Sequence, residues 1–474
     1  MLRYRLVYLL IFLLPAGCAM GPDYIRPELA LPAAPDNATA QSAPFTAADW
    51  WKLFDDPTLD RIEGEALAYN RDLHMAIARV DEARALARIA FADRLPAAGF
   101  GAGASRGRLS QEAAEPGKSR INESLDAFGL ASFELDLWGK YRRLDEAARA
   151  ELLATEAARD AVQLSLTAEV AAGYFRLRAL EAQTRIARDQ LATYDKSCEI
   201  YRKRYRLGYT QELDLRRIEA DRLATEALLY QRENEQSKAE TALALLLGRS
   251  PRDIVQGFSE QGKTLEELNV FPRTPENIPS DLLARRPDIR RDEEMLIAAN
   301  ARIGAARAAF FPSIHLTGQY GFASSALENL FTDGANVWTI AGVLTQPVFE
   351  GGKLFAREKA ARARQEQMLA HYEQTVQNAF RETRDALVAG SKTSQVLAAS
   401  IERVQATRRS CELSRKQHSR GYISIIDVLD IQRRSLQAEL ELSAARQGQL
   451  DAIIALCRAM GGGWREKADE TRLY

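Results

Sequence analysis

The stretch that decides the fold is Leu-Asp-Ala-Phe-Gly-Leu-Ala-Ser-Phe-Glu-Leu-Asp-Leu-Trp-Gly-Lys, at residues 125–140. Up to residue 137 the sequence alternates, because apolar side chains occupy every second position and polar ones fill most of the gaps. The apolar set is Leu125, Ala127, Gly129, Ala131, Phe133, Leu135 and Leu137, and the polar set is Asp126, Ser132, Glu134 and Asp136. A period of two predicts a β-strand with one apolar face. From Lys140 onward the pattern predicts a helix instead.

The helix predicted from Lys140 is very long, and a second one of the same kind follows later. Residues 140–207 and 353–420 contain no proline and one glycine each, Gly173 and Gly390. An alanine-rich run without proline favours uninterrupted helix. At about 1.5 Å per residue each run makes a rod of about 100 Å, which no globular core can contain. An apolar seam at coiled-coil spacing follows the first rod and consists of Val162, Leu166, Val170, Tyr174, Leu177 and Leu180.

The chain is an internal duplication with a constant offset of 213 residues. The matching glycines are Gly139 and Gly352, Gly208 and Gly421, and Gly248 and Gly461 (352−139, 421−208 and 461−248). Each half is therefore predicted to contain a long rod, a glycine turn and a returning helix of about 35 residues. An amphipathic helix is also predicted over 57–93, and its length suits the part of the rod that the returning helix leaves uncovered.

Each half is also predicted to contain two strands ahead of its rod. The predicted strands are 95–106 and 125–137 in the first half, and 313–324 and 337–349 in the second. Strands of about ten residues with one apolar and one polar face have the length and pattern of transmembrane β-barrel strands. A soluble antiparallel sheet is the alternative. Four strands cannot close a useful barrel, so in a membrane several chains would have to share one barrel.

The composition excludes several classes of protein. The chain has 474 residues, of which 64 are basic and 65 acidic, so it can bury several cores and has no nucleic-acid footprint. No stretch of about 18 apolar residues follows residue 17, so no helix is expected to cross a bilayer. Of the four cysteines, Cys198 and Cys411 are expected to pack as small apolar residues. The four histidines are scattered, so no metal site, cofactor or enzymatic activity is predicted.

The first residues predict a membrane anchor. Two arginines precede the apolar run 6–14, and Pro15-Ala16-Gly17-Cys18 follows it, which is the pattern of a signal peptide. A Cys preceded by Ala and Gly resembles the lipobox of bacterial lipoproteins, whose mature N-terminal Cys carries acyl chains. Cys18 is therefore the predicted lipidation site, and Ala19 after it favours sorting to the outer membrane. An ordinary secreted protein with a chance Cys is the alternative.

Several separated motifs span nearly the whole mature chain. They are Gly17-Cys18-Ala19-Met20-Gly21-Pro22-Asp23-Tyr24, Trp50-Trp51-Lys52-Leu53-Phe54-Asp55-Asp56-Pro57, Ala284-Arg285-Arg286-Pro287-Asp288-Ile289-Arg290, Ile303-Gly304-Ala305-Ala306-Arg307, Phe310-Phe311-Pro312-Ser313, Pro347-Val348-Phe349-Glu350-Gly351-Gly352 and Gly461-Gly462-Gly463-Trp464. In kind and order they resemble the outer membrane factor family, the TolC-like and OprM-like channels of tripartite efflux pumps.

The resemblance implies a mostly α-helical fold with a transmembrane β part. It implies a homotrimer in the bacterial outer membrane, in which each protomer gives four strands to one twelve-stranded β-barrel and its helices to a barrel that extends into the periplasm. The implied partners are outer-membrane lipid, a periplasmic membrane-fusion adaptor and an inner-membrane pump of the resistance-nodulation-division type. The implied function is a passive exit duct for drugs or other small toxic compounds.

The returning helix of the second half carries a candidate gate. Asp427 and Asp430 lie three positions apart on one helix face, with Arg433 a turn further along. The resemblance implies that these residues form the constriction at the periplasmic end. A solvated first helix turn is the alternative, because Asp there is favourable to the helix dipole. The first repeat has Asp214 and Arg217 at the matching positions, so only the second hairpin is the gate candidate.

The two hairpin turns are predicted at Gly208 and Gly421, because glycine tolerates positive φ. By resemblance these tips face the adaptor. The residues assigned to the tips are Arg206, Leu207, Gly208, Tyr209, Arg420, Gly421 and Tyr422.

The sequence predicts an organisation in six parts. They are a signal peptide (1–17), a lipidated extended leader (18–56), the first repeat (57–248), an equatorial linker region (249–286), the second repeat (287–463) and a C-terminal tail (464–474). Two other functions stay open on the sequence. One is the outer-membrane channel of a type I protein secretion system, and the other is a structural coiled-coil lipoprotein without barrel strands.

Overall fold

The computed structural model describes residues 19–29, 49–112, 119–257, 262–268 and 286–462. Cys18 and the motif residues Gly17, Ala284, Arg285, Gly463 and Trp464 lie outside these residues, as do the predicted signal peptide (1–17) and the predicted C-terminal tail (464–474). The chain divides into two compact units. The first draws on Met1–Leu29, Arg79–Glu156 and Arg291–Glu373, and the second on Ala30–Ala78, Ala157–Arg290 and Gln374–Tyr474.

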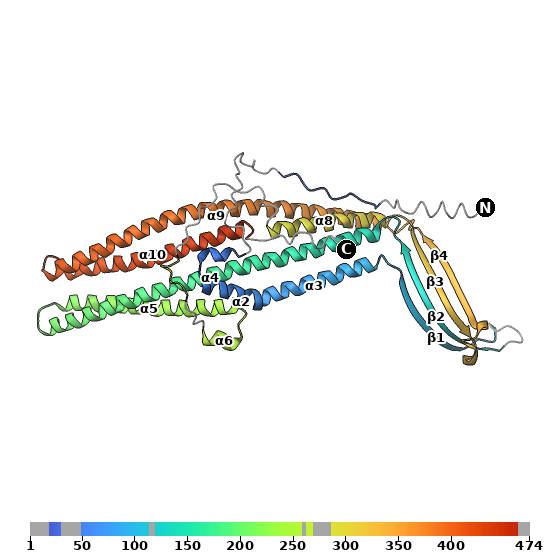
Figure 1. The fold of residues 1–474 in the computed structure, drawn as a ribbon, viewed down its shortest axis with the longest axis horizontal. Coiled ribbons are helices and arrows are strands. Elements are labelled where there is room, and N and C mark those ends of the chain that lie inside the picture. Colours follow the sequence, from blue (N-terminus) through green and yellow to red (C-terminus); the bar gives the residue numbers. More distant parts are fainter. Residues whose placement is uncertain (1–18, 30–48, 113–118, 258–261, 269–285, 463–474) are drawn as a thin grey trace. The chain divides into compact units, whose positions relative to one another are not determined.

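The first unit contains one antiparallel sheet with its strands in the order β1-β2-β3-β4 (Figure 1). The strands are β1 (Ala97–Arg108), β2 (Ile121–Leu135), β3 (Ser313–Ser324) and β4 (Asn336–Thr345). Four strands of this kind were predicted, and that part of the fold is confirmed. The predicted strand 337–349 runs too far, because Pro347 has no N–H to donate to a ladder. The predicted strand 95–106 begins too early, because the N–H of Leu95 still donates to Ala92 in the preceding helix turn.

Parts of four helices complete the first unit. They belong to α3 (Arg71–Ala92), α4 (Lys140–Arg206), α8 (Pro287–Ala308) and α9 (Lys353–Ser419). Helices α4 and α8 meet through a cluster of buried alanines, Ala147, Ala150, Ala298 and Ala301. Small side chains let two helix backbones approach closely, which explains why this part of the sequence is rich in alanine.

The leader residues 19–29 dock on this unit. The buried guanidinium of Arg143 donates to the carbonyl of Met20 at 3.2 Å and pairs with Asp23 at 2.7 Å. Gly21, at φ 99°, crosses α8 at Gly304, where a Cβ on Gly21 would lie 2.4 Å from the Gly304 Cα. Only a glycine fits there, so the motif glycines 21 and 304 are explained by one backbone crossing.

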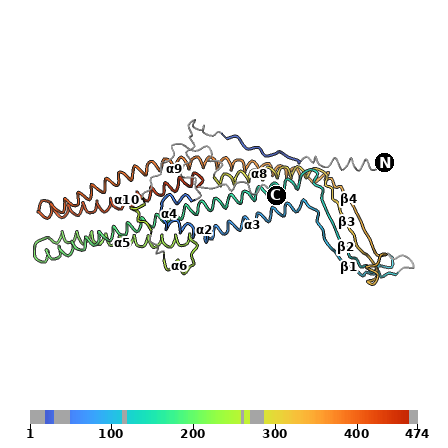
Figure 2. Tube along the Cα trace, in the orientation of Figure 1, coloured from blue at the N-terminus to red at the C-terminus, as the bar shows by residue number. Residues whose placement is uncertain are grey.

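The second unit is built on two helical hairpins. The first consists of α4 and α5 (Glu212–Leu246), and the second of α9 and α10 (Ile425–Ala459). In Figures 1 and 2, α5 runs back along α4 and α10 runs back along α9. Both long helices have 67 residues and both returning helices have 35. The prediction of two uninterrupted rods, each followed by a shorter returning helix, is confirmed.

The core of the second unit is aromatic. Trp50 and Phe54, on a 3-10 helix at Trp50–Phe54, are almost fully buried, and Phe54 packs edge-on against Phe175 of α4 at 4.6 Å. Tyr174 donates its hydroxyl hydrogen bond to Asp56 at 2.6 Å. Of the predicted seam on α4, Leu166, Val170, Tyr174, Leu177 and Leu180 are buried. The short helix α6 (Pro251–Gln256) follows α5.

The predicted single helix over 57–93 is wrong. The structure has α2 (Pro57–Tyr69) and α3, separated at Asn70, whose backbone is extended at φ −61° and ψ 132°. The Asn70 side chain accepts from the N–H of Leu73 at 3.0 Å and donates to the carbonyl of Leu246 at 2.9 Å. Asn is among the best N-cap residues, so it ends one helix and begins the next. The apolar period continues through the break and does not reveal it.

Candidate functional site: the sheet and the hairpin tips

One face of the sheet is apolar across all four strands. The register places Phe100, Gly129, Tyr320 and Trp338 in one row. Alternate residues of each strand complete the face, namely Ala98, Ala102, Ala104, Leu125, Ala127, Ala131, Phe133, Leu135, Ile314, Leu316, Gly318, Phe322, Ile340, Gly342 and Leu344. Arg106, Glu123 and Asn336 follow at the end of the face away from α4. In the single chain Trp338 is 67% exposed and Ile340 is 80% exposed. An apolar face this wide marks an interaction site and not a surface made for water.

The opposite face carries most of the polar side chains of the sheet. It holds Ser124, Asp126, Ser132, Glu134, His315, Thr317, Gln319 and Thr339. At the end nearest α4, Glu134 accepts from the hydroxyl of Tyr141 at 2.6 Å and from Lys140 at 3.3 Å. His315 lies 3.7 Å from the same carboxylate. A polar face backing a lipid-compatible one is the pattern of an outer-membrane barrel with a water-filled interior.

The dimensions of the apolar face fit a bilayer. It runs from Leu125 to Leu135 on β2, which is eleven residues, and a membrane β-strand needs about 9–11. Within the described chain, β1 pairs only with β2 and β4 only with β3, so each outer strand has one unpaired edge. Unpaired N–H and C=O groups are not tolerated in lipid, so these edges need partner strands from other chains.

In the ranges that the structure describes, no helix combines the length and the apolar character that a bilayer-crossing helix requires.

Both hairpin tips are built on the same glycine cap. Gly208 has φ 76°, and the N–H groups of Gly208 and Tyr209 donate to Tyr205 and Arg204 at 3.0 and 2.8 Å. Gly421 has φ 81°, and Gly421 and Tyr422 donate in the same way to His418 and Gln417 at 2.9 and 3.0 Å. This pair of bonds is the Schellman motif, which satisfies the last helix carbonyls and reverses the chain.

The tips also present apolar side chains to their surroundings. Leu207 is 69% exposed, Tyr209 80% and Tyr422 76%. The tip residues named from the sequence therefore lie where the chain turns. Exposed Tyr and Leu on a rigid turn are suited to contact with another protein.

The structure brings only part of the predicted gate together. Asp430 lies 3.7 Å from Arg433 and 2.8 Å from Arg434, so one carboxylate faces two guanidinium groups. Asp427 instead completes a capping box with Ser424, because its carboxylate accepts from the Ser424 N–H at 3.0 Å. Asp427 is exposed and Asp430 half-buried.

The two hairpins are joined near their tips by a bond that the sequence does not reveal. The Tyr201 hydroxyl lies 2.8 Å from Nε2 of His418, and Nδ1 of the same ring lies 3.0 Å from the carbonyl of Ile423. The carbonyl can only accept, so Nδ1 carries the proton in the neutral ring and Nε2 accepts from Tyr201. The bond ties α4 of the first hairpin to α9 of the second.

Two further residues gain a role only from the structure. The buried guanidinium of Arg286 pairs with Asp288 at 2.6 Å and Glu382 at 2.8 Å and donates to the carbonyl of Ala459 at 3.1 Å, so it caps the end of α10. Glu63 on α2 is fully buried, and neither of its oxygens has a hydrogen-bond partner among the described residues. Its spacing from the core residues of α2 is the one signal that could have marked it.

The described residues contain no cluster of three His, Cys, Asp or Glu side chains suited to a metal ion. Cys198, Cys411 and Cys457 are free thiols. Cys198 is buried with Tyr194 and Tyr201 in a small core between α4 and α5, in contact with Leu429.

Comparison with known proteins identifies the family. A family model described as outer membrane efflux protein matches residues 63–249 and 278–462. The chain belongs to the outer membrane efflux protein family. Proteins of this family are channels and not enzymes, and this member lies in the outer membrane and extends into the periplasm. The recognition made from the sequence motifs is confirmed.

The similarity to individual proteins extends over nearly full lengths. The chain is 34% identical over 462 residues to the probable efflux pump outer membrane protein TtgC of Pseudomonas putida, covering 96% of this chain and 94% of that protein. It is 35% identical over 460 residues to the cation efflux system protein CusC of Escherichia coli, with 95% and 96% covered. The crystal structure of the Campylobacter jejuni CmeC outer membrane channel matches with a TM-score of 0.89 at 26% identity, with 95% and 96% covered.

Proposed function

We propose that this chain is the outer-membrane exit duct of a tripartite efflux pump, and that three copies close one twelve-stranded barrel. The observation that carries the proposal is the four-stranded sheet with one continuous apolar face and two unpaired edges. Three such sheets joined edge to edge leave no open strand in lipid and enclose their polar faces. Substrate moves passively through the duct, and transport energy enters at the inner membrane.

The relatives support small toxic compounds as the exported class. Their names include efflux pumps for toluene, for solvent, for antibiotics and for cations. These chemistries have little in common, so a duct that serves them cannot rely on one shaped site. We therefore assign selection of the substrate to the pump and not to this chain.

The exposed tips support an assignment of the adaptor contact. The side chains of Leu207, Tyr209 and Tyr422 are assigned to contact with a periplasmic membrane-fusion adaptor. An inner-membrane pump of the resistance-nodulation-division type is assigned as the third component. Asp427, Asp430 and Arg433 are assigned to the gate, where three copies would place six carboxylates around one opening. Cys18 is assigned to lipidation.

The test is reconstitution of the purified mature protein into planar bilayers. A trimer that shifts to monomers on heating in detergent gels and conducts ions in discrete steps is the expected result. A monomer that stays soluble without detergent would overturn the proposal.

The lipid anchor has its own test. Cys18→Ser should abolish incorporation of labelled palmitate while heat-modifiable trimers still form, because the barrel also holds the protein in the membrane. Equal labelling of the variant and the parent would contradict the assignment of Cys18.

A further inference from the structure

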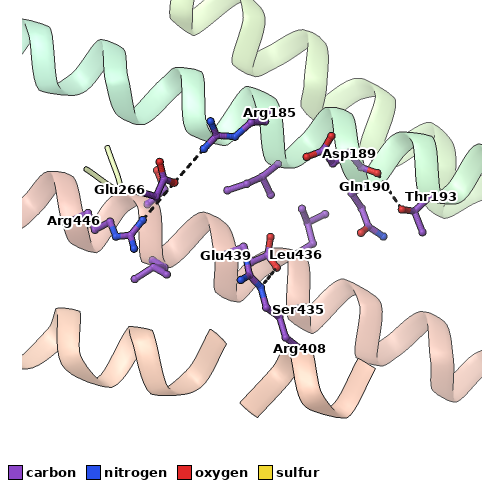
Figure 3. Close-up of a pocket in the computed structure, with 13 residues that line it drawn as sticks. Arg185, Asp189, Gln190, Thr193, Glu266, Arg408, Ser435, Leu436, Glu439 and Arg446 are labelled. Carbon is purple, nitrogen blue, oxygen red and sulfur yellow. Dashed lines mark hydrogen bonds and ion pairs between the residues drawn. The ribbon is translucent and has the colours of Figure 1, made fainter. Parts of the chain in front are cut away.

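A cavity of about 330 Å³ lies in the second unit between the two hairpins (Figure 3). One wall is α4 from Arg185 to Thr193, and the other is α10 from Ser435 to Arg446. Charged and polar side chains line most of it, so the cavity suits water and not an apolar contact. At this level the hairpins are therefore held by charged groups and not by close packing.

One link across the cavity is a shared carboxylate. Oε1 of Glu266 lies 3.2 Å from Arg185 of α4 and 3.4 Å from Arg446 of α10. Figure 3 shows Glu266 between the two guanidinium groups. Arg185 belongs to the first hairpin and Arg446 to the second, so one side chain joins both.

Glu266 is held in place independently of the arginines. Its neighbours Leu265 and Leu268 are 2% and 6% exposed and belong to the aromatic core of the second unit. Thr264 donates from its N–H and its hydroxyl to Glu267 at 2.8 and 3.0 Å, which closes a tight turn around residue 266. The backbone that carries the carboxylate is thus anchored to the core on both sides of residue 266.

The hairpins pack directly on either side of the cavity. On one side Ser443 of α10 donates to the carbonyl of Ala179 on α4 at 3.3 Å. On the side toward the tips, Leu429 of α10 packs against Tyr194 and Cys198 of α4. The cavity lies along the seam between these contacts, so a movement of one hairpin against the other has room there and must break at least one bridge of Glu266.

We propose that Glu266 is a brace that sets the resting separation of the two hairpins, and hence the fraction of trimers whose periplasmic end is open. The inference rests on the proposed duct function, since it concerns regulation of that duct. Glu266 is a positioning residue and need not touch the exported compound. Separation of the hairpins would break at least one of these two bridges in each subunit, and hence at least three in the trimer.

The chain supplies a matched control. Arg188 and Glu233 form a bridge of 2.9 Å between α4 and α5, which are two helices of the same hairpin. The side chains of Glu233 and Glu266 are both 41% exposed, and those of Arg188 and Arg185 are 62% and 53% exposed. Glu233 thus makes its bridge within one hairpin, whereas Glu266 makes one bridge to each hairpin.

The experiment compares Glu266→Gln with Glu233→Gln in planar bilayers, after gels show that both variants form trimers. We expect Glu266→Gln to raise the ratio of open to closed channels about tenfold, because an exposed bridge contributes modestly and three subunits lose theirs together. Glu233→Gln should match the parent. Arg446→Gln should reproduce the effect, and adding it to Glu266→Gln should change little.

The outcomes separate this inference from the proposed duct. If Glu266→Gln gates like the parent while Asp427→Ala with Asp430→Ala conducts, the brace is wrong and the duct stands. If neither the parent nor any variant conducts, the duct itself is wrong. Equal effects of Glu266→Gln and Glu233→Gln would also overturn the brace, because a loss of any surface charge would then explain them.

Discussion

The two long helices have equal lengths and matching positions, yet they differ in how much they bury. Phe175 of α4 is fully buried, whereas its counterpart 213 residues later, Val388 of α9, is 53% exposed. Along α9 other apolar side chains are exposed too, including Phe355 at 72% and Val396 at 56%. The equivalent long helices therefore differ, since α4 contributes to the core at this position and α9 lies at the surface.

The returning helices show the opposite arrangement. Thirteen residues of α10 are buried, but six of α5, and Tyr230 and Leu245 on α5 are more than 60% exposed. Each hairpin thus has one buried and one exposed helix. Within the chain α10 bonds α4 at Ala179 and also contacts α5, and we expect the exposed apolar side chains of α5 and α9 to face neighbouring subunits.

The largest expected effect tests the difference between the two long helices at the equivalent residues Phe175 and Val388. Phe175→Ala removes a ring that packs on Phe54, and we expect it to lower the free energy of unfolding by about 3–5 kcal/mol per chain. Val388→Ala should lower the free energy of unfolding of the chain by less than about 0.5 kcal/mol, but it should weaken the trimer. Urea unfolding followed by tryptophan fluorescence measures the first effect, and the trimer fraction in dilute detergent measures the second.

Equal unfolding losses in these two variants would contradict the comparison, since Val388 would then lie in a core of its own chain. Loss of trimers in Phe175→Ala alone would contradict the assignment of the α9 face to a neighbouring subunit. Thr393→Ala on α9, where the hydroxyl bonds its own helix, is a suitable control.

One buried carboxyl group in each half allows the two halves to be compared through the pH dependence of stability. Asp292 on α8 has Arg291 at 2.7 Å and His371 at 3.4 Å, whereas Glu63 on α2 has no described partner. Burial raises the pKa of Glu63 well above its usual value, and nearby Asp60 adds to the rise. The folded chain therefore keeps this proton at pH values where the unfolded chain loses it.

The sign of the effect follows from this difference. Below a pH of about 4.3 both states hold the proton, and as the pH rises the unfolded state alone releases it. Glu63 should then lower the free energy of unfolding by up to about 1.4 kcal/mol per pH unit until the folded carboxyl also ionises. Glu63→Gln should remove that slope in urea unfolding between about pH 4.5 and pH 7. The exposed Glu82→Gln is the control, and an unchanged slope in Glu63→Gln would refute the assignment.

The gate pair tests the comparison at the tips. Asp427→Ala with Asp430→Ala should raise cation conductance several-fold, because it removes the carboxylates that we assign to the opening and the partner of Arg433. Asp214→Ala in the first hairpin should leave conductance unchanged. Conductance is measured on single trimers in planar bilayers.

Asp427 also caps its helix, so a second control is needed. Ser424→Ala removes the capping bond to the Asp427 N–H and keeps both carboxylates, at a cost in stability of about 1 kcal/mol. If Ser424→Ala opens the channel as far as the double variant does, capping and not charge explains the result. In that case the gate assignment fails.

Much of the fold could be predicted because the signals are local. The period of two at residues 125–137 predicts a strand, and the absence of proline in 140–207 predicts a long helix. Each signal acts within one segment, so the prediction does not depend on how the segments pack. The break at Asn70 could not be predicted in this way, since the apolar period crosses it and the deciding bond is to Leu246, far along the chain.

The site was harder to predict for the same physical reason. Gly208 and Gly421 are required by their own backbone conformation, so the tips could be located from sequence. The links of Tyr201 and Glu266 depend on which helix faces which across the seam. Both halves have the same apolar periodicity, so the sequence does not reveal that α4 and α10 are the more buried helices of their hairpins. That difference arises from how the helices pack.

The smallest expected effect concerns the hydrogen bond between Tyr201 and His418, which has no counterpart at the equivalent positions of the two repeats. Tyr201 bonds His418 across the hairpins, but the reciprocal positions hold Ser414 and Tyr205, and Ser414 bonds the carbonyl of Cys411 in its own helix. Tyr201→Phe keeps the buried ring and removes one hydrogen bond, so we expect a loss of about 1 kcal/mol in urea unfolding. Tyr205→Phe, at an exposed ring, should cost nothing measurable.

Equal losses would mean that the two hairpins meet symmetrically near their tips, and the division into one buried and one exposed helix per hairpin would not extend that far. A loss confined to Tyr201→Phe would carry the asymmetry of the long helices to the tips themselves.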